Sequence, residues 1–216
     1  MAGQTDRILV LASAFGDLDE ARVEAEVESL LQGGMRPREI QKILELGMRI
    51  VAENYRIGEY FLADRLFAGR IYRQIMELPR MSSALPGAAP LGTVLVGTLP
   101  GELHDEGNDA LAAALRSLGF RAIDLGLGAE ADELEAALVE LEPCAAVLSC
   151  WRAGAAAGMA PLVRRLRGAF PSMGGLALRG GEALATAFAE LGADAYAEDI
   201  LAAQDFCLAR ARGARS

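Results

Sequence analysis

His104, the single histidine of this chain, lies in a setting that suits a metal ligand. It follows the apolar run 93–98 and a glycine-rich turn, and the carboxylates of Glu102 and Asp105 flank it. A strand that ends in such a turn can present an imidazole at a sheet edge, and a neighbouring carboxylate can fix the tautomer of the ring. Taken alone, this window favours the simpler interpretation of a surface histidine, so the decision depends on residues elsewhere in the chain.

Two further segments with polar or glycine residues follow predicted strands downstream of this histidine. Residues 108–148, 41 positions, separate Gly107 from Ser149. Residues 152–179, 28 positions, separate Trp151 from Gly180. Because the carboxyl ends of parallel strands meet at one edge of a sheet, we expect the three segments to meet there.

The chain from residue 93 onward alternates between strand and helix patterns. Such alternation, with crossovers of helical length, implies a parallel sheet covered on both faces. We therefore expect residues 93–216 to form a doubly wound, Rossmann-like (flavodoxin-like) domain with a five-stranded sheet. The expected strands are 93–97, 121–125, 145–149, 175–178 and 195–196, and the expected helices are 109–118, 130–141, 158–169, 182–191 and 200–211.

The residues before the sheet have helical periodicity throughout, which predicts an all-α domain over residues 1–78. A four-helix bundle would account for the pattern. The segment 79–92 is rich in proline and small residues and is expected to be an interdomain linker. The expected helices are a short one over 7–14, one over 20–32, one from Pro37 to a break at 56–58, and one over 60–76.

Composition excludes several classes of function. The net charge of −9 and the pI near 4.8 argue against nucleic-acid binding, and no apolar stretch reaches transmembrane length. The three cysteines lack metal-ligand spacing and suggest reduced thiols in a soluble cytoplasmic protein. No G-x-G-x-x-G motif follows a predicted strand, which disfavours nicotinamide binding.

Together the three segments resemble the signature of the cobalamin-binding domains of methionine synthase and corrinoid proteins. The family pattern is Asp-x-His-x-x-Gly, then Ser-x-Leu, then Gly-Gly, at separations that this chain matches. The helical half from Gly47 to Leu62 is similar to the cap domain of methyl-transferring members, so the resemblance covers nearly the whole chain. The matching residues are Glu102-x-His104-x-x-Gly107, Ser149-x-Trp151 and Gly180-Gly181.

The resemblance implies that His104 replaces the cofactor's own benzimidazole as the lower ligand of cobalt, so that the nucleotide tail lies in a channel within the domain. Glu102 would accept a hydrogen bond from the distal imidazole nitrogen, and the pair could take up a proton when the imidazole leaves. Asp105 either tunes the imidazole or caps the next helix, and capping is favoured. The implied cofactor-binding residues are Glu102, His104, Asp105, Gly107, Ser149, Trp151, Gly180 and Gly181, together with Tyr55 and Leu62 of the cap.

The implied function is that of a methyl carrier without a complete active site of its own. A substrate-specific methyltransferase would load a methyl group on cobalt, and a second methyltransferase would pass it to a thiol or a pterin. A reductive activase is a further implied partner. Methylamines, betaines, methanol and aryl methyl ethers are candidate methyl donors in one-carbon metabolism, and the sequence does not choose among them.

Some positions depart from the family pattern. Glu102 replaces aspartate, Trp151 replaces leucine in a place where an indole would narrow the tail channel, and Ala153 replaces a hydroxyl residue. Asn108 stands where lysine is frequent. Two alternatives therefore stay open, namely a cobalamin-dependent sensor and a divergent scaffold with weakened or lost cofactor binding. A mutase is disfavoured because mutases pair this domain with a large barrel.

Overall fold

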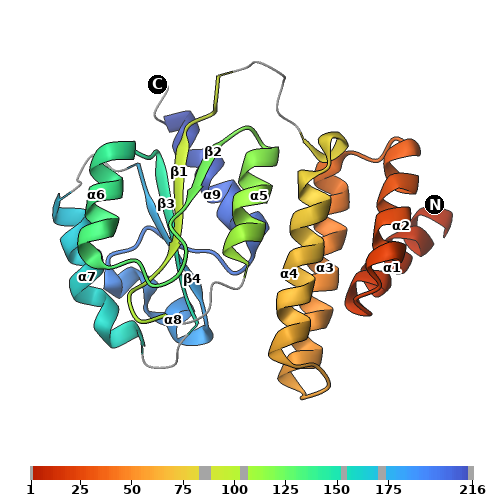
Figure 1. Ribbon diagram of the computed structural model, residues 1–216, viewed down its shortest axis with the longest axis horizontal. Helices are drawn as coiled ribbons and strands as arrows, with labels where there is room; N and C mark the ends of the chain where they lie inside the picture. The colour runs from red at the N-terminus through yellow and green to blue at the C-terminus, as the bar shows by residue number, and fades with distance from the viewer. Residues whose placement is uncertain (1, 83–88, 103–106, 152–154, 170–173, 214–216) are drawn as a thin grey trace. The chain divides into compact units, whose positions relative to one another are not determined.

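A computed structural model describes residues 2–82, 89–102, 107–151, 155–169 and 174–213 of the chain (Figure 1). The chain divides into two compact units, a helical unit over Met1–Ala84 and an α/β unit over Leu85–Ser216. No helix in the described ranges is long and apolar enough to cross a membrane. Each unit is built around its own hydrophobic core.

The helical unit contains the predicted four helices. Its core consists of the apolar residues that recur at helical spacing, such as Phe15, Val27 and Leu44, which are all fully buried. Gly47 lets two helices approach closely, because a Cβ there would lie 2.5 Å from the Cβ of Phe15. The helices are α1 (Ala2–Gly16), α2 (Glu20–Gln32), α3 (Pro37–Arg56) and α4 (Leu62–Glu77).

Local signals explain where these helices begin. The side chain of Asp19 caps α2 by accepting a hydrogen bond from the backbone N–H of Arg22. Proline occupies the first turn of α3, where its missing N–H costs nothing. Helix α1 begins earlier than the predicted residue 7, because its polar first turn carries no apolar periodicity. After α4, the 3₁₀ turn Pro79–Met81 buries Met81 in this unit, so the segment 79–92 begins with ordered structure.

The α/β unit is the predicted five-stranded, fully parallel sheet, with the strand order β2-β1-β3-β4-β5. This is the flavodoxin-like order of a doubly wound fold. The strands are β1 (Thr93–Thr98), β2 (Arg121–Asp124), β3 (Ala145–Cys150), β4 (Leu176–Gly180) and β5 (Ala195–Tyr196). The helices are α5 (Asn108–Ser117), α6 (Ala131–Leu141), α7 (Ala155–Ala169), α8 (Glu182–Leu191) and α9 (Ile200–Gly213).

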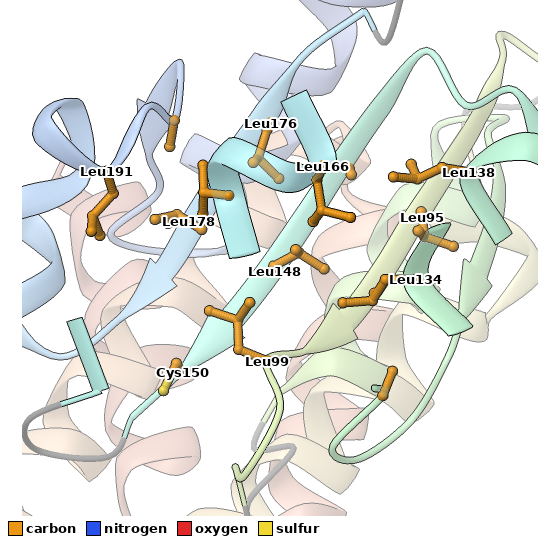
Figure 2. Packing of buried hydrophobic residues seen from close by; sticks show 14 of the residues in the cluster. Leu95, Leu99, Leu134, Leu138, Leu148, Cys150, Leu166, Leu176, Leu178 and Leu191 are labelled. Atoms are coloured by element: carbon orange, nitrogen blue, oxygen red, sulfur yellow. The ribbon is translucent and has the colours of Figure 1, made fainter. Parts of the chain in front are cut away.

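The two faces of the sheet have different partners, as Figure 1 shows. Because side chains alternate along a strand, Leu95, Leu148 and Leu178 all point to one face, where they pack against α6, α7 and α8 (Figure 2). The intervening positions face α5 and α9, which are linked by a hydrogen bond from the Gln204 side chain to the carbonyl of Ala114. The second face carries the polar residues described below.

Candidate functional site

The carboxyl ends of β1, β3 and β4 form a row of polar side chains on the α5/α9 face. Thr98 pairs with Ser149, and Ser149 pairs with Arg179, in the register of the three strands. Paired residues of parallel strands point to the same face, and all three are buried. The three predicted segments therefore meet at one sheet edge, which is where ligands bind in such folds.

The segment after β1 begins with a tight turn that positions Glu102. Its backbone N–H donates to the carbonyl of Leu99 over 3.1 Å. Pro100 and Gly101 occupy the centre of the turn, and the φ of +77° at Gly101 requires glycine in a type II turn. The Glu102 side chain is only 3% exposed, and its carboxylate accepts a 2.6 Å hydrogen bond from the backbone N–H of Trp151. The first and second segments are thus held together by a buried carboxylate.

The start of α5 brings a second polar contact to the same edge. Gly107 precedes the helix with a φ of +80°, a conformation that favours glycine. The buried hydroxyl of Ser149 donates to Oδ1 of Asn108 over 2.8 Å. The Nδ2 atom of Asn108 is also buried, and it has no hydrogen-bond partner among the described residues. Buried polar atoms rarely lack a hydrogen-bond partner. The Nδ2 atom of Asn108 therefore indicates that a further acceptor belongs at this edge.

Gly180 at the end of β4 and Gly181 directly after it differ in their surroundings. A Cβ at Gly180 would overlap the carbonyl oxygen of Cys150 and would come within 2.7 Å of Leu184 in α8, so packing within the chain requires this glycine. A Cβ at Gly181 would meet only the carbonyl oxygen of Trp151, at 4.0 Å. The space beside Gly181 is therefore open among the described residues, whereas Gly180 faces the opposite side of the sheet from Ser149.

Tyr196 supports this turn from β5. Its hydroxyl donates to the carbonyl of Gly180. Burial raises the pKa of Tyr196, the positive charge of Arg179 opposes the change, and the negative charge of Glu198 acts in the same direction as burial. Arg179 is therefore close enough to influence this end of the sheet electrostatically.

Arg179 is the site residue that the sequence analysis did not single out. It is 6% exposed, and its guanidinium carbon lies 5.6 Å from the centroid of the Trp151 ring. A Cβ at Gly107 would lie 2.9 Å from its Nη2 atom. The sequence contains a signal for Arg179, because this charged residue directly follows the apolar run Leu176-Ala177-Leu178.

The structure describes two of the four remaining predicted site residues. His104 and Asp105 fall outside the described residues, as does Ala153. Tyr55 and Leu62 belong to the helical unit, at the end of α3 and the start of α4. They are 40% and 36% exposed, which leaves apolar surface at that turn.

Two family models cover most of the chain. A model described as a B12 binding domain matches residues 10–78, and a second model of the same description matches residues 92–204. The first match falls in the helical unit and the second spans the sheet and its helices.

Curated relatives agree with these matches. Trimethylamine corrinoid protein 1 of Methanosarcina acetivorans is 34% identical over 129 residues, which are 58% of this chain and 60% of that protein. Trimethylamine corrinoid protein 2 of Methanosarcina mazei is 31% identical over 146 residues, which are 66% of this chain and 67% of that protein. The aligned part thus spans about three fifths to two thirds of these relatives.

Solved structures show the same fold. A cobalamin-binding protein from Desulfitobacterium hafniense DCB-2 has a TM-score of 0.60 at 25% identity, with 94% of this chain and 98% of that chain covered. The monomethylamine corrinoid protein of Methanosarcina barkeri has a TM-score of 0.66 at 20% identity, with 92% and 95% covered. With both of its units matched by B12-binding models, this chain belongs to the corrinoid proteins that join a helical B12-binding domain to a Rossmann-like one.

Proposed function

We propose that this chain carries a methyl group on the cobalt of a bound corrinoid, between a substrate-specific methyltransferase and a second methyltransferase that acts on a thiol or a pterin. The relatives named for trimethylamine support a methylamine as the donor class, and a related protein from Methanosarcina barkeri is named for methanol. The observation that carries the proposal is the convergence of the three motif segments at one edge of the sheet.

The described residues suit a large polar ligand seated on this edge. The buried Nδ2 atom of Asn108 offers a donor, and no described side chain fills the space beside Gly181. A bound corrin would supply a cobalt that becomes strongly nucleophilic when it is reduced. The chain itself would hold the cobalt through a nitrogen of His104, and Ser149 would border the nucleotide tail.

Glu102 would act on that imidazole. The N–H of Trp151 holds one of its carboxylate oxygens, which fixes the side chain at the edge. A carboxylate in this position would orient the ring of His104, fix its tautomer and raise its basicity. When the imidazole is not a ligand, the carboxylate–imidazole pair would hold a proton, so ligation and protonation would be linked.

The exposed apolar surface at Tyr55 and Leu62 would shield the bound corrinoid. An apolar cover excludes water and competing ligands from a reactive centre. It must also move aside when a methyltransferase binds, as lids do in other systems. The chain would therefore act as a carrier, with the chemistry of each transfer completed by its partners and reduced cobalt restored by a reductive activase.

Reconstitution with methylcobalamin and with hydroxocobalamin tests this proposal. We expect a stoichiometric corrinoid to stay with the protein through gel filtration, with an absorbance spectrum that differs from that of the free cofactor. His104→Ala should shift the bound spectrum, whereas Arg121→Ala, an exposed change at the amino end of β2, should not. Loss of all corrinoid on the column would contradict the proposal and favour a scaffold.

A light experiment separates the carrier from a sensor. Protein loaded with adenosylcobalamin should keep one oligomeric state before and after illumination, as measured by light scattering. A light-dependent change of that state would favour the regulatory alternative. Transfer of a labelled methyl group from the loaded protein to a thiol, in the presence of a suitable methyltransferase, would complete the assignment.

A further inference from the structure

Arg179 is buried at the centre of the proposed site. It precedes the two glycines on β4 and pairs in register with Ser149, so both side chains face α5 and α9. Alanine, Ala177, occupies the preceding position of β4 on this face and is fully buried. The structure therefore places a long cationic side chain, 6% exposed, next to a small residue on this face.

The guanidinium extends from β4 toward the start of α5. Its Nη2 atom lies next to Gly107, where a Cβ would be 2.9 Å away, and the group stacks over the indole of Trp151 at 5.6 Å. A cation at the N-terminal end of a helix is opposed by the helix dipole. The dipole of α5 therefore does not favour an arginine at this position.

Resting on the proposed function, we propose that Arg179 determines which corrinoids this domain accepts. Its guanidinium lies beside Gly107 and over Trp151, where a nucleotide tail that borders Ser149 would lie. A corrinoid with a complete benzimidazole nucleotide binds only after the guanidinium has left this position. A corrinoid with a truncated tail leaves the guanidinium in place and binds more tightly.

Two physical costs set the direction of this preference. Removal of the guanidinium from Trp151 gives up a cation–π contact that is shielded from water. The displaced charge must then find solvent or an anion, because an unpaired buried charge is costly. A valine at position 179 removes both costs and shortens the side chain, and valine is well accommodated in a strand.

Equilibrium titrations with cobalamin and with cobinamide, which lacks the nucleotide, test the proposal. We expect the unmodified protein to bind cobinamide at least about tenfold more tightly than cobalamin. Arg179→Val should strengthen cobalamin binding by about tenfold and leave cobinamide binding within about threefold. Arg121→Val, the same exchange at the exposed amino end of β2, should change neither affinity. Arg179→Ala serves if the valine variant fails to fold.

Three results would contradict the inference in distinguishable ways. Weaker cobalamin binding by Arg179→Val would mean that the guanidinium pairs with the phosphodiester of the tail. Equal affinities for the two corrinoids, unchanged in the variant, would mean that the side chain does not lie in the path of the tail. Failure of both corrinoids to bind any folded variant would overturn the proposed function itself.

Discussion

Buried polar groups are used differently in the two units of this molecule. In the helical unit, the hydroxyl of Tyr72 donates to Glu45 over 2.8 Å and accepts from the Gln41 side chain over 2.8 Å, so that α3 and α4 are joined through their core. In the α/β unit, the buried polar residues Glu102, Asn108, Ser149 and Arg179 gather at one edge of the sheet. The first group connects two helices, whereas the second lies where the three motif segments meet.

The difference separates polar burial for stability from polar burial for binding. The Tyr72 group lies among core side chains, and each of its hydrogen bonds holds packed helices in place. The edge group includes an amide nitrogen, Nδ2 of Asn108, that no described residue bonds. A fold that needed only stability would gain from an apolar residue at such a position. The edge is therefore the part of the chain whose polar residues are best explained by a ligand.

Replacement of the two adjacent glycines gives the largest expected contrast. Gly180→Ala should lower the free energy of unfolding of the α/β unit by about 3 kcal/mol or more, because its Cβ overlaps the Cys150 carbonyl. Gly181→Ala should change it by less than about 0.5 kcal/mol, because the nearest atom of the described residues is 4.0 Å away. Urea denaturation measures both. An equal loss of unfolding free energy in the two variants would show that packing restricts Gly180 and Gly181 to the same degree.

Tyr72→Phe tests the group of buried polar side chains around Tyr72 in the helical unit. The change removes a donor from a buried carboxylate and should lower the free energy of unfolding of the helical unit by about 1–3 kcal/mol. Burial and the negative charge of Glu45 hold the pKa of Tyr72 well above its ordinary value, so the hydroxyl remains a donor through neutral pH. Corrinoid affinity of the folded protein should not change. A weaker affinity at full stability would assign this group to binding as well.

Asn108→Ala tests the buried polar residues at the sheet edge by the same two measurements, stability and corrinoid affinity. Loss of the Ser149 hydrogen bond should cost about 1 kcal/mol of stability, and corrinoid affinity should also fall by about tenfold. Ser117→Ala is the matched control, since it removes a buried hydrogen bond to Ala114 from the other end of the same helix. Ser117→Ala should lower the free energy of unfolding and leave corrinoid affinity unchanged. Equal effects of both variants on affinity would remove the distinction between the two groups.

Cys207 gives the smallest expected effect. Burial in α9 raises the pKa of its thiol to about 12, from an ordinary value of 9.0. The folded chain thus keeps this proton where the unfolded chain loses it, so stability falls as the pH rises from 9 toward 12. The difference in the free energy of unfolding between the unmodified protein and Cys207→Ala should change by about 1 kcal/mol between pH 8 and pH 10. An unchanged difference would show that the thiol ionises freely.

The sequence predicted the architecture because its signals are local. Periodicity identified the four helices, and the alternation of strands and helices identified the parallel sheet. Strand β4 extends to Gly180, beyond the predicted residue 178, since the charge of Arg179 conceals a strand position that pairs with Ser149. Helix α7 begins at Ala155, before the predicted residue 158, in a run of small residues without apolar periodicity.

The site was predictable only in part. The motif residues identified the three segments, and the sheet brings them to one edge. The contacts of Asn108 with Ser149, of Glu102 with Trp151, and of Arg179 with the indole depend on tertiary packing between segments far apart in the chain. No local pattern encodes such contacts. The ligand role of His104 stays a prediction.

Electron paramagnetic resonance of the reduced cobalt(II) corrinoid, bound to protein labelled uniformly with ¹⁵N, tests that role most directly. The chain has one histidine, so an axial imidazole nitrogen from the protein can be assigned without ambiguity. We predict doublet splitting of the cobalt lines in labelled protein and triplet splitting in unlabelled protein. A triplet in labelled protein, which would come from the cofactor's own base, or lines without nitrogen splitting, would contradict ligation by His104.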